Sequence, residues 1–166
     1  MTDAAKKLID RMERDGLTLA VAESCTGGLV GGRITEIPGA SKTFLGGVIA
    51  YANDVKVTQL GVDAALLTDG HGAVSAAVAT AMARGVRKKF GAKLAIAVTG
   101  IAGPFAGTTG KRIGTVWLAA LGPGDLVNVH RIQAEGDRAA VREAAVNEAI
   151  QLLDRNIREA EKERLV

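Results

Sequence analysis

Hydroxyl, cysteine and glycine residues follow a short apolar run near the N-terminus, in the segment 22–28, AESCTGG. Ser24 is a candidate nucleophile, because a serine between a buried strand and a Gly-Gly pair lies on an exposed turn. The flanking glycines of the G-x-S-x-G elbow are missing, so Ser24 or Thr26 could instead cap a helix that begins near Gly27. Cys25 is a rival nucleophile, although without a nearby histidine it better fits a small packed side chain.

A serine nucleophile needs a base, and the chain offers a lysine and two histidines. Lys56 lies three positions after Asn53, in a segment that also holds Tyr51, the only tyrosine. A helix starting in this segment would direct Lys56 back towards the end of the preceding strand, where burial would lower its pKa. A solvated surface lysine is the alternative. His71 and His130 have no obvious orienting carboxylate, so a Ser-His-Asp triad has little support.

A second apolar run ends in hydroxyl and glycine residues at 97–104, AVTGIAGP. Ligands of open α/β sheets bind beyond the carboxyl ends of strands, so backbone N–H groups of 22–28 and 97–104 could form an oxyanion hole. The glycine-rich loop that follows is not a P-loop, because Phe105 and Arg112 stand where Gly and Ser or Thr are required. Nucleoside triphosphate chemistry is therefore not indicated.

Apolar runs alternate with amphipathic segments along the chain. This alternation predicts one domain over residues 1–166, a three-layer α/β/α sandwich around a mixed, mostly parallel sheet. Ser75 and Gly91 fit the two ends of a long alanine-rich helix. Strands are predicted near 17–24, 44–52, 94–100, 114–121 and 126–133, and helices over 3–15, from about 28 to 35, over 54–62 and 76–90, and from 137 almost to the end.

The composition narrows the function classes. The 166 residues are 48% hydrophobic and 23% charged, which is typical of a globular domain with a real core. The net charge is only +3 and aromatic residues make up 3%, so no basic stripe with stacking aromatics supports nucleic-acid binding. One cysteine and two distant histidines give no disulfide and no metal cluster, and no cofactor is expected. Without a membrane-length apolar run or a signal peptide, a cytoplasmic protein is expected.

Six motifs occur in order along residues 5–155, namely AESCTGG, GGVIAYAND-x-K, HGAVS, AVTGIAGP, GTVW and GDR. Together they resemble the carboxy-terminal domain family of CinA, the competence/damage-inducible protein, and its stand-alone form, the nicotinamide-nucleotide amidase. The resemblance implies a metal-independent hydrolase that converts nicotinamide mononucleotide to nicotinate mononucleotide and ammonia. It also implies that the chain forms a homodimer or a higher homo-oligomer. The binding partner that it implies is the small-molecule substrate, nicotinamide mononucleotide.

The resemblance further implies roles for individual residues. It makes Ser24 the nucleophile, Lys56 the base and Tyr51 the assisting tyrosine, and it puts Arg138 at the active site. The other residues expected to bind substrate belong to the segments described above, and they are Cys25, Thr26, Gly27, Gly28, Asn53, Thr99, Gly100 and Gly103.

Arg138 is also unusual for its local position. Asp137 is a good helix cap, so Arg138 falls in the first helical turn, where a cation opposes the helix dipole. A surface arginine paired with a nearby acid is one interpretation. The other, favoured by the resemblance, is an anion site for the substrate's phosphate.

The loop after 97–104 departs from the family pattern. That pattern usually reads Gly-Pro-Gly-Gly-Gly and ends in Lys-Pro-Val-Gly, whereas this chain has Phe105 and Ala106 after Pro104 and ends with Lys-Arg-Ile-Gly at 111–114. Two other function classes stay open. A non-catalytic nucleotide-binding module is supported only by this altered loop, and an accessory protein in DNA uptake or repair is suggested only by the family's name.

Overall fold

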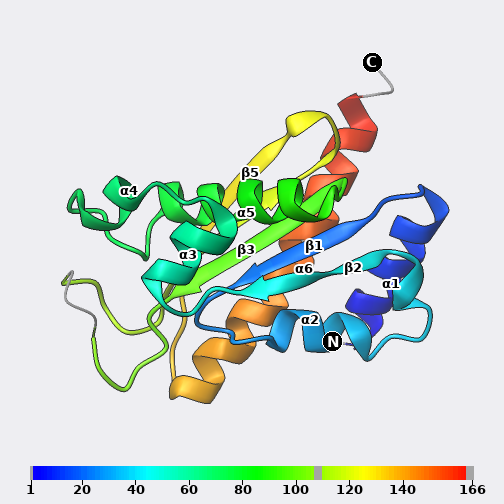
Figure 1. The fold of residues 1–166 in the computed structure, drawn as a ribbon. Coiled ribbons are helices and arrows are strands. Elements are labelled where there is room, and N and C mark those ends of the chain that lie inside the picture. The colour runs from blue at the N-terminus through cyan, green and yellow to red at the C-terminus, as the bar shows by residue number, and fades with distance from the viewer. Residues whose placement is uncertain (1, 107–109, 164–166) are drawn as a thin grey trace.

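One five-stranded sheet organises the chain, in the strand order β2-β1-β3-β4-β5 (Figure 1). The computed structural model describes residues 2–106 and 110–163. β1 pairs in parallel with β2 and β3, whereas β4 pairs antiparallel with β3 and β5. The expected mixed sheet is confirmed, and β4 alone runs against the other strands of this sheet. The strands are β1 (Leu19–Glu23), β2 (Phe44–Ile49), β3 (Leu94–Gly100), β4 (Thr115–Leu121) and β5 (Val127–Gln133).

Helices cover both faces of the sheet, which confirms the three-layer sandwich. On one face α1 (Thr2–Arg14), α2 (Leu29–Thr35) and α6 (Arg138–Glu163) share a core with β1, β3 and β4. On the other face α3 (Asn53–Leu60) and α5 (Ala76–Phe90) form the second core, and α4 (Ala64–Thr68) packs beside α5. Two short 3-10 turns, η1 (Ala40–Lys42) and η2 (Pro123–Asp125), lie in connections. No helix within the described ranges is long and apolar enough to cross a membrane.

Small side chains let α5 and α3 pack closely over the sheet. The strands present alanines to this layer, including Ala20, Ala22 and Ala97, all fully buried. A Cβ at Gly85 of α5 would lie only 1.9 Å from the carbonyl oxygen of Leu60, at the end of α3. This tight packing explains how a chain with few aromatic residues fills its core.

Element boundaries match the predictions best where a cap or a buried run defines them. β3 and α5 have the predicted bounds, and Ser75 Oγ accepts the N–H of Val78 at 3.2 Å as the cap of α5. β2 ends at Ile49 rather than near 52, because the chain turns there towards α3. The short helix α4 was not predicted. Its five residues bury no side chain, so they carry no amphipathic signal, and only the cap at Asp63 marks its start.

The sheet register brings the two polar segments to the same end of the fold, as predicted. Glu23 of β1 is opposite Val98 of β3, and the N–H of Ser24 donates to the carbonyl of Val98 at 2.9 Å. β2 and β3 lie on opposite sides of β1, so the carboxyl end of β1 is a topological switch point. This is the usual place for a ligand crevice in an open α/β sheet.

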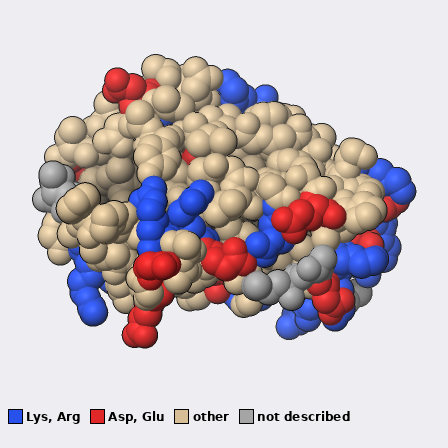
Figure 2. Space-filling view, turned by 90° about the horizontal axis from the view of Figure 1, so that it is seen from below, with Lys and Arg blue, Asp and Glu red and all other residues tan. Residues whose placement is uncertain are grey.

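Charge on the surface is mixed in sign. Figure 2 shows basic and acidic side chains close together on one face, beside a wide uncharged area. Pairing accounts for part of this charge, since Arg33 contacts Glu143 at 3.0 Å and Lys42 contacts Glu13 at 2.5 Å. This face offers no one-signed stripe of the kind that tracks a nucleic-acid backbone.

Candidate active site

A buried lysine amine contacts the candidate nucleophile at the carboxyl end of β1. Lys56 Nζ lies 3.2 Å from Ser24 Oγ. Lys56 belongs to the first turn of α3, and its side chain runs back to the end of β2, as the sequence predicted. The residue is 1% exposed, so the alternative of a solvated surface lysine is wrong.

Two backbone carbonyls hold the Lys56 amine in place. Nζ donates to the carbonyl oxygens of Ala50 at 2.9 Å and Tyr51 at 3.1 Å. No carboxylate of the described residues forms an ion pair with it. Burial therefore lowers the pKa of Lys56 below its usual value near 10.5, because the charged form loses water without gaining an opposite charge. Burial thus makes it easier for the amine to lose its proton, and the neutral amine is the form that can act as a base.

Glu23 fastens the turn that carries Ser24. Its buried carboxylate accepts three backbone N–H groups at the start of α2, from Gly28 at 2.9 Å, Val30 at 3.1 Å and Gly31 at 2.8 Å. The carbonyl of the same residue accepts the N–H of Ala50 at 2.7 Å. One residue thus links the nucleophile turn to the segment that supplies the lysine's carbonyls. Sequence reasoning missed Glu23, although an acid at the end of a wholly apolar strand was a signal for it.

The glycines after Ser24 shape the turn and do not line the cavity. Gly27 and Gly28 adopt φ values of +57° and +100°, which glycine tolerates and other residues rarely adopt. The N–H of Gly27 donates to Ser24 O, and that of Gly28 is bound by Glu23. Thr26 is fully buried and also lies outside the cavity wall. The structure therefore does not bring Thr26, Gly27 or Gly28 to the cavity, and neither glycine N–H is free for an oxyanion.

A cavity of about 300 Å³ opens beside Ser24. Arg138 reaches it from the start of α6, where Asp137 Oδ1 caps the helix by accepting the N–H of Ala140 at 2.9 Å. Arg138 donates to the Gly103 carbonyl at 2.6 Å and to the Tyr51 hydroxyl at 2.8 Å, and it forms no ion pair with a described acid. Of the expected site residues, nine line this cavity, namely Ser24, Cys25, Tyr51, Asn53, Lys56, Thr99, Gly100, Gly103 and Arg138.

The segment between α4 and α5 forms a wall of the cavity that sequence reasoning missed. Ala73 and Val74 line the cavity. Thr99 Oγ1 donates to the carbonyl of Ala73 at 2.8 Å, and Lys111 Nζ donates to the carbonyl of Val74 at 2.5 Å. HGAVS at 71–75 is one of the motifs of the resemblance, but these contacts hold the wall through its backbone, so the residue types did not reveal that it lines the cavity. Residues 107–109 of the predicted glycine-rich loop lie outside the described residues.

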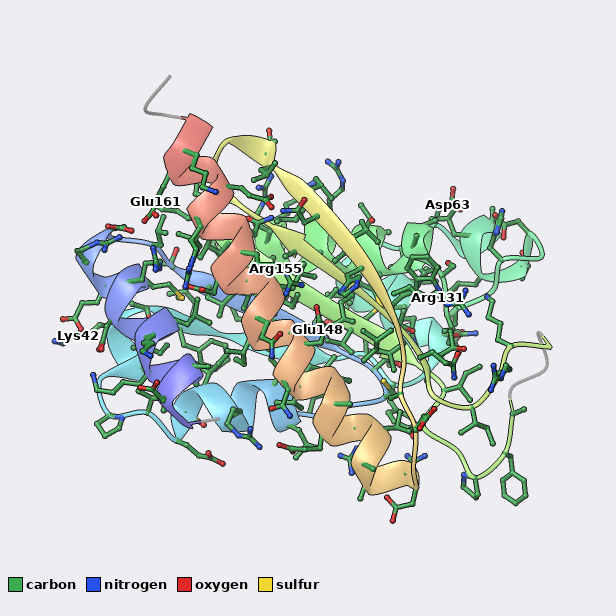
Figure 3. All side chains as sticks on the ribbon, turned by 180° about the vertical axis from the view of Figure 1, so that it is seen from behind. Lys42, Asp63, Arg131, Glu148, Arg155 and Glu161 are labelled. Carbon is green, nitrogen blue, oxygen red and sulfur yellow. The ribbon has the colours of Figure 1, made fainter. Side chains whose placement is uncertain are left out.

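The rival catalytic groups have unsuitable surroundings. Burial raises the pKa of the Cys25 thiol to about 11, which disfavours the thiolate that a cysteine nucleophile needs. His130 does have a carboxylate partner, contrary to the expectation, since its Nδ1 lies 2.6 Å from Glu148 of α6 (Figure 3). However, His130 lies on β5 and is not among the residues that line the Ser24 cavity. His71 is exposed and does not line the Ser24 cavity. Lys56 is therefore the basic group in contact with Ser24.

Comparison with known proteins identifies the family. The model of the CinA C-terminal domain matches residues 1–157. The chain belongs to the CinA C-terminal domain family. It is 50% identical over 153 residues to a CinA-like protein of Gemmatimonas aurantiaca, which covers 92% of the chain and 35% of that relative. A CinA-like protein of Geotalea daltonii is 51% identical over 130 residues, covering 78% of the chain and 31% of the relative. The chain thus spans about a third of the length of these curated relatives.

Solved structures of CinA proteins share the fold. The competence/damage inducible protein CihA of Agrobacterium tumefaciens superposes with a TM-score of 0.88 at 39% identity, over 92% of both chains. The competence damage-inducible protein A (ComA) of Klebsiella pneumoniae gives a TM-score of 0.88 at 32% identity, over 92% of this chain and 93% of the other. The α/β sandwich described above is therefore the fold of the CinA domain.

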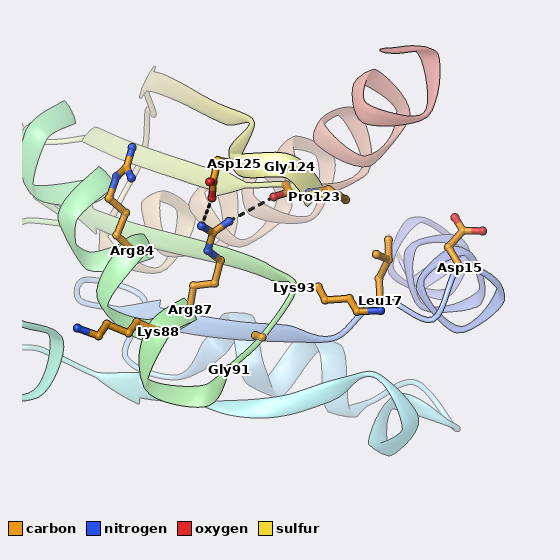
Figure 4. A pocket seen from close by; sticks show the side chains of 12 residues that line it. Asp15, Leu17, Arg84, Arg87, Lys88, Gly91, Lys93, Pro123, Gly124 and Asp125 are labelled. Carbon is orange, nitrogen blue, oxygen red and sulfur yellow. Dashed lines mark hydrogen bonds and ion pairs between the residues drawn. The ribbon is translucent and has the colours of Figure 1, made fainter. Parts of the chain in front are cut away.

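A larger hollow, of about 760 Å³, lies at the other end of the CinA-domain sheet (Figure 4). Its wall is rich in cations, but two of them already have partners. Arg87 contacts Asp125 and the carbonyl of Gly122, and Lys93 Nζ donates to the carbonyl of Gly16 at 2.8 Å. Basic residues in the last turn of α5 also suit the helix dipole. No serine, cysteine or histidine is among the residues that line this hollow, so it offers none of the candidate nucleophiles found at the smaller cavity.

The Glu23 clamp yields a prediction about stability. Glu23→Ala should lower the free energy of unfolding by about 2–4 kcal/mol, since three N–H groups at the start of α2 lose their acceptor. Glu23→Gln should cost less, because one of its two terminal atoms still accepts. Urea denaturation measures both values. Glu36→Ala, an exposed acid at the other end of α2, is the control and should change stability by no more than about 0.5 kcal/mol. Equal losses for Glu23→Ala and Glu36→Ala would contradict the clamp.

Proposed function

We propose that this chain hydrolyses the carboxamide of nicotinamide mononucleotide to nicotinate mononucleotide and ammonia, with Ser24 as nucleophile and Lys56 as base. The supporting observation is a buried lysine amine that has no carboxylate partner among the described residues and lies 3.2 Å from a serine hydroxyl. Membership of the CinA C-terminal domain family and the resemblance of the motifs to the nicotinamide-nucleotide amidases support the choice of substrate.

Counting hydrogen-bond donors explains how Lys56 would act. A neutral amine has two N–H groups and one lone pair. The two N–H groups donate to the carbonyls of Ala50 and Tyr51, so the lone pair remains for the hydroxyl proton of Ser24. Ser24 Oγ then attacks the carboxamide carbon as its proton moves to Lys56. After this transfer the protonated amine has three N–H groups. They match the three oxygens around it, which are the carbonyl oxygens of Ala50 and Tyr51 and Ser24 Oγ.

The acyl-enzyme step also needs an acid and an oxyanion site. Tyr51 accepts a hydrogen bond from Arg138, which leaves its own hydroxyl proton free to pass to the leaving ammonia. Near the nucleophile, the N–H groups of Cys25, Ala102 and Gly103 have no acceptor among the described residues, and all three residues line the cavity. They are the candidates for stabilising the oxyanion. The proton that Lys56 took from Ser24 then passes to Tyr51, which restores the phenol and leaves the amine neutral. Water attacks the ester as Lys56 accepts its proton, and Lys56 finally returns that proton to Ser24 Oγ.

Arg138 is the proposed contact for the substrate's phosphate. Its guanidinium carries five N–H donors, and the contacts with Gly103 and Tyr51 use two of them. The remaining donors are available to an anion at the cavity mouth. Asp137 already binds one N–H of the first turn of α6, so the side chain of Arg138 would supply most of the binding.

Ammonia release from nicotinamide mononucleotide tests the proposal directly. The wild-type protein should release ammonia, and Ser24→Ala and Lys56→Ala should each lower kcat by about a thousandfold or more, because each removes a group that acts in the reaction. Cys25→Ala is the matched control, adjacent to Ser24 in sequence, and should keep most of the activity. A chain that only binds nucleotides or assists DNA uptake would release no ammonia. Loss of activity in Cys25→Ala but not in Ser24→Ala would overturn the assignment of the nucleophile.

The pH dependence should report the lowered pKa of Lys56. The base must be neutral in the free enzyme, so kcat/KM should rise with pH through the pKa of Lys56 and level off above it. Because burial lowers this pKa, the rising limb should lie below pH 10.5. A limb at or above 10.5 would show that Lys56 is not the base.

The same shift should appear in stability, where no substrate is needed. Between the lowered pKa and about 10.5 the unfolded chain binds a proton at Lys56 that the folded chain does not, so stability should rise with pH across this window. Lys56→Met removes this contribution. Urea denaturation of both proteins should therefore show the wild type gaining stability relative to Lys56→Met as the pH rises.

A comparison of two substrates tests the role of Arg138. Arg138→Ala should lower kcat/KM for the mononucleotide by about 10- to 100-fold, as expected for the loss of a charged hydrogen bond to phosphate. The loss for the phosphate-free riboside should be much smaller. Arg131→Ala, an exposed residue of β5 that does not line the cavity, is the control and should affect neither substrate. Equal losses on both substrates would show that Arg138 does not read the phosphate.

A further inference from the structure

Two of the chain's few aromatic side chains are exposed at the mouth of the Ser24 cavity. Phe105 is 86% exposed and Tyr51 is 58% exposed, and both line the cavity. The other aromatic residues, Phe44, Phe90 and Trp117, pack against the two cores. In a chain whose aromatics otherwise stabilise the core, an unpacked phenyl ring at the mouth of a cavity suggests a ligand contact.

The charges of the cavity wall restrict what that ligand contact can be. Arg138 is a cation, Lys56 is a second basic group, and no aspartate or glutamate is among the residues that line the cavity. A cationic ring would therefore find no counter-ion in this wall. An aromatic face attracts a cation through its quadrupole, so the exposed rings of Tyr51 and Phe105 are the groups of the wall that can bind a cation.

Arg138 fixes where the Phe105 segment begins. Its guanidinium donates to both the carbonyl of Gly103 and the hydroxyl of Tyr51, so the backbone two residues before Phe105 is tied to the other exposed ring. The Phe105 side chain itself remains unpacked. The backbone near Phe105 is thus held beside the cavity, while the exposed phenyl ring can rotate to cover a bound ligand.

We propose that Phe105 is a specificity-determining residue that covers the cationic pyridinium ring of the substrate and binds it through a cation–π contact. The proposal rests on the proposed function and deepens it, because it names the positive charge of the ring as a recognised feature.

Binding to a catalytically silent protein tests this proposal. In the Ser24→Ala background, Phe105→Leu should raise the Kd of nicotinamide mononucleotide about two- to fivefold, the range typical of an exposed cation–π contact. It should leave almost unchanged the Kd of the reduced dihydropyridine form, whose ring is neutral and not aromatic. Phe105→Trp should bind the cationic form at least as tightly as phenylalanine does. Val129→Ala, an exposed apolar residue of β5, is the control and should alter neither Kd.

The outcomes separate this proposal from the proposed function. An unchanged Kd for the cationic form in Phe105→Leu would overturn it, and so would an equal loss for both forms, which would indicate general apolar contact. These ratios do not depend on turnover. If the wild-type protein released no ammonia while the charge-dependent ratio held, the proposed reaction would fail and the ring contact would stand.

Discussion

The burial of the Lys56 amine without an opposite charge is the constraint on which the site depends. A buried ammonium that lacks a counter-ion is costly, and the cost disappears when the amine is neutral and its N–H groups are satisfied. The carbonyls of Ala50 and Tyr51 satisfy them, so the chain between β2 and α3 must turn at this point. The placement of Lys56, the proposed base, thus comes from backbone geometry. A carboxylate beside Lys56 would hold it too, but in the protonated form.

Hydrogen bonds at the end of β1 connect the segment around Lys56 to Ser24, the proposed nucleophile. Glu23 accepts the N–H of Ala50 with its carbonyl and three N–H groups of the α2 turn with its carboxylate. Ser24, the next residue, is tied to β3 through Val98. The backbone carbonyls that bind Lys56, the turn that carries Ser24 and the cavity wall near Thr99 therefore belong to one hydrogen-bonded unit. Such a unit holds reacting groups in place before the substrate arrives, which is what catalysis by proximity requires.

Much of this arrangement was predictable from the sequence, and the limits have physical reasons. The buried run at 94–100 and the capped helix after Ser75 gave correct boundaries, because both signals are local. The turn at 22–28 and the segment at 51–56 pointed to Ser24 and Lys56, since parallel strands end at the same edge of a sheet. The Arg138 contacts with Gly103 and Tyr51 were not predictable, because they join segments far apart in sequence. The exclusion of Thr26–Gly28 from the cavity was not predictable either, because it depends on the direction in which the turn after Ser24 faces.

The carboxylate of Glu23 has a consequence for where the molecule can hold anions. In many nucleotide-binding α/β domains, the helix after the first strand leaves its N-terminal amides open to a phosphate. Here those amides at Gly28, Val30 and Gly31 are bound by an anion that the chain supplies itself. The corner next to Ser24 is thereby closed to phosphate and left to uncharged groups such as a carboxamide. In the proposed function, negative charge would instead be recognised across the cavity by Arg138 at the start of α6, so the two ends of the substrate would contact segments that lie far apart in the chain.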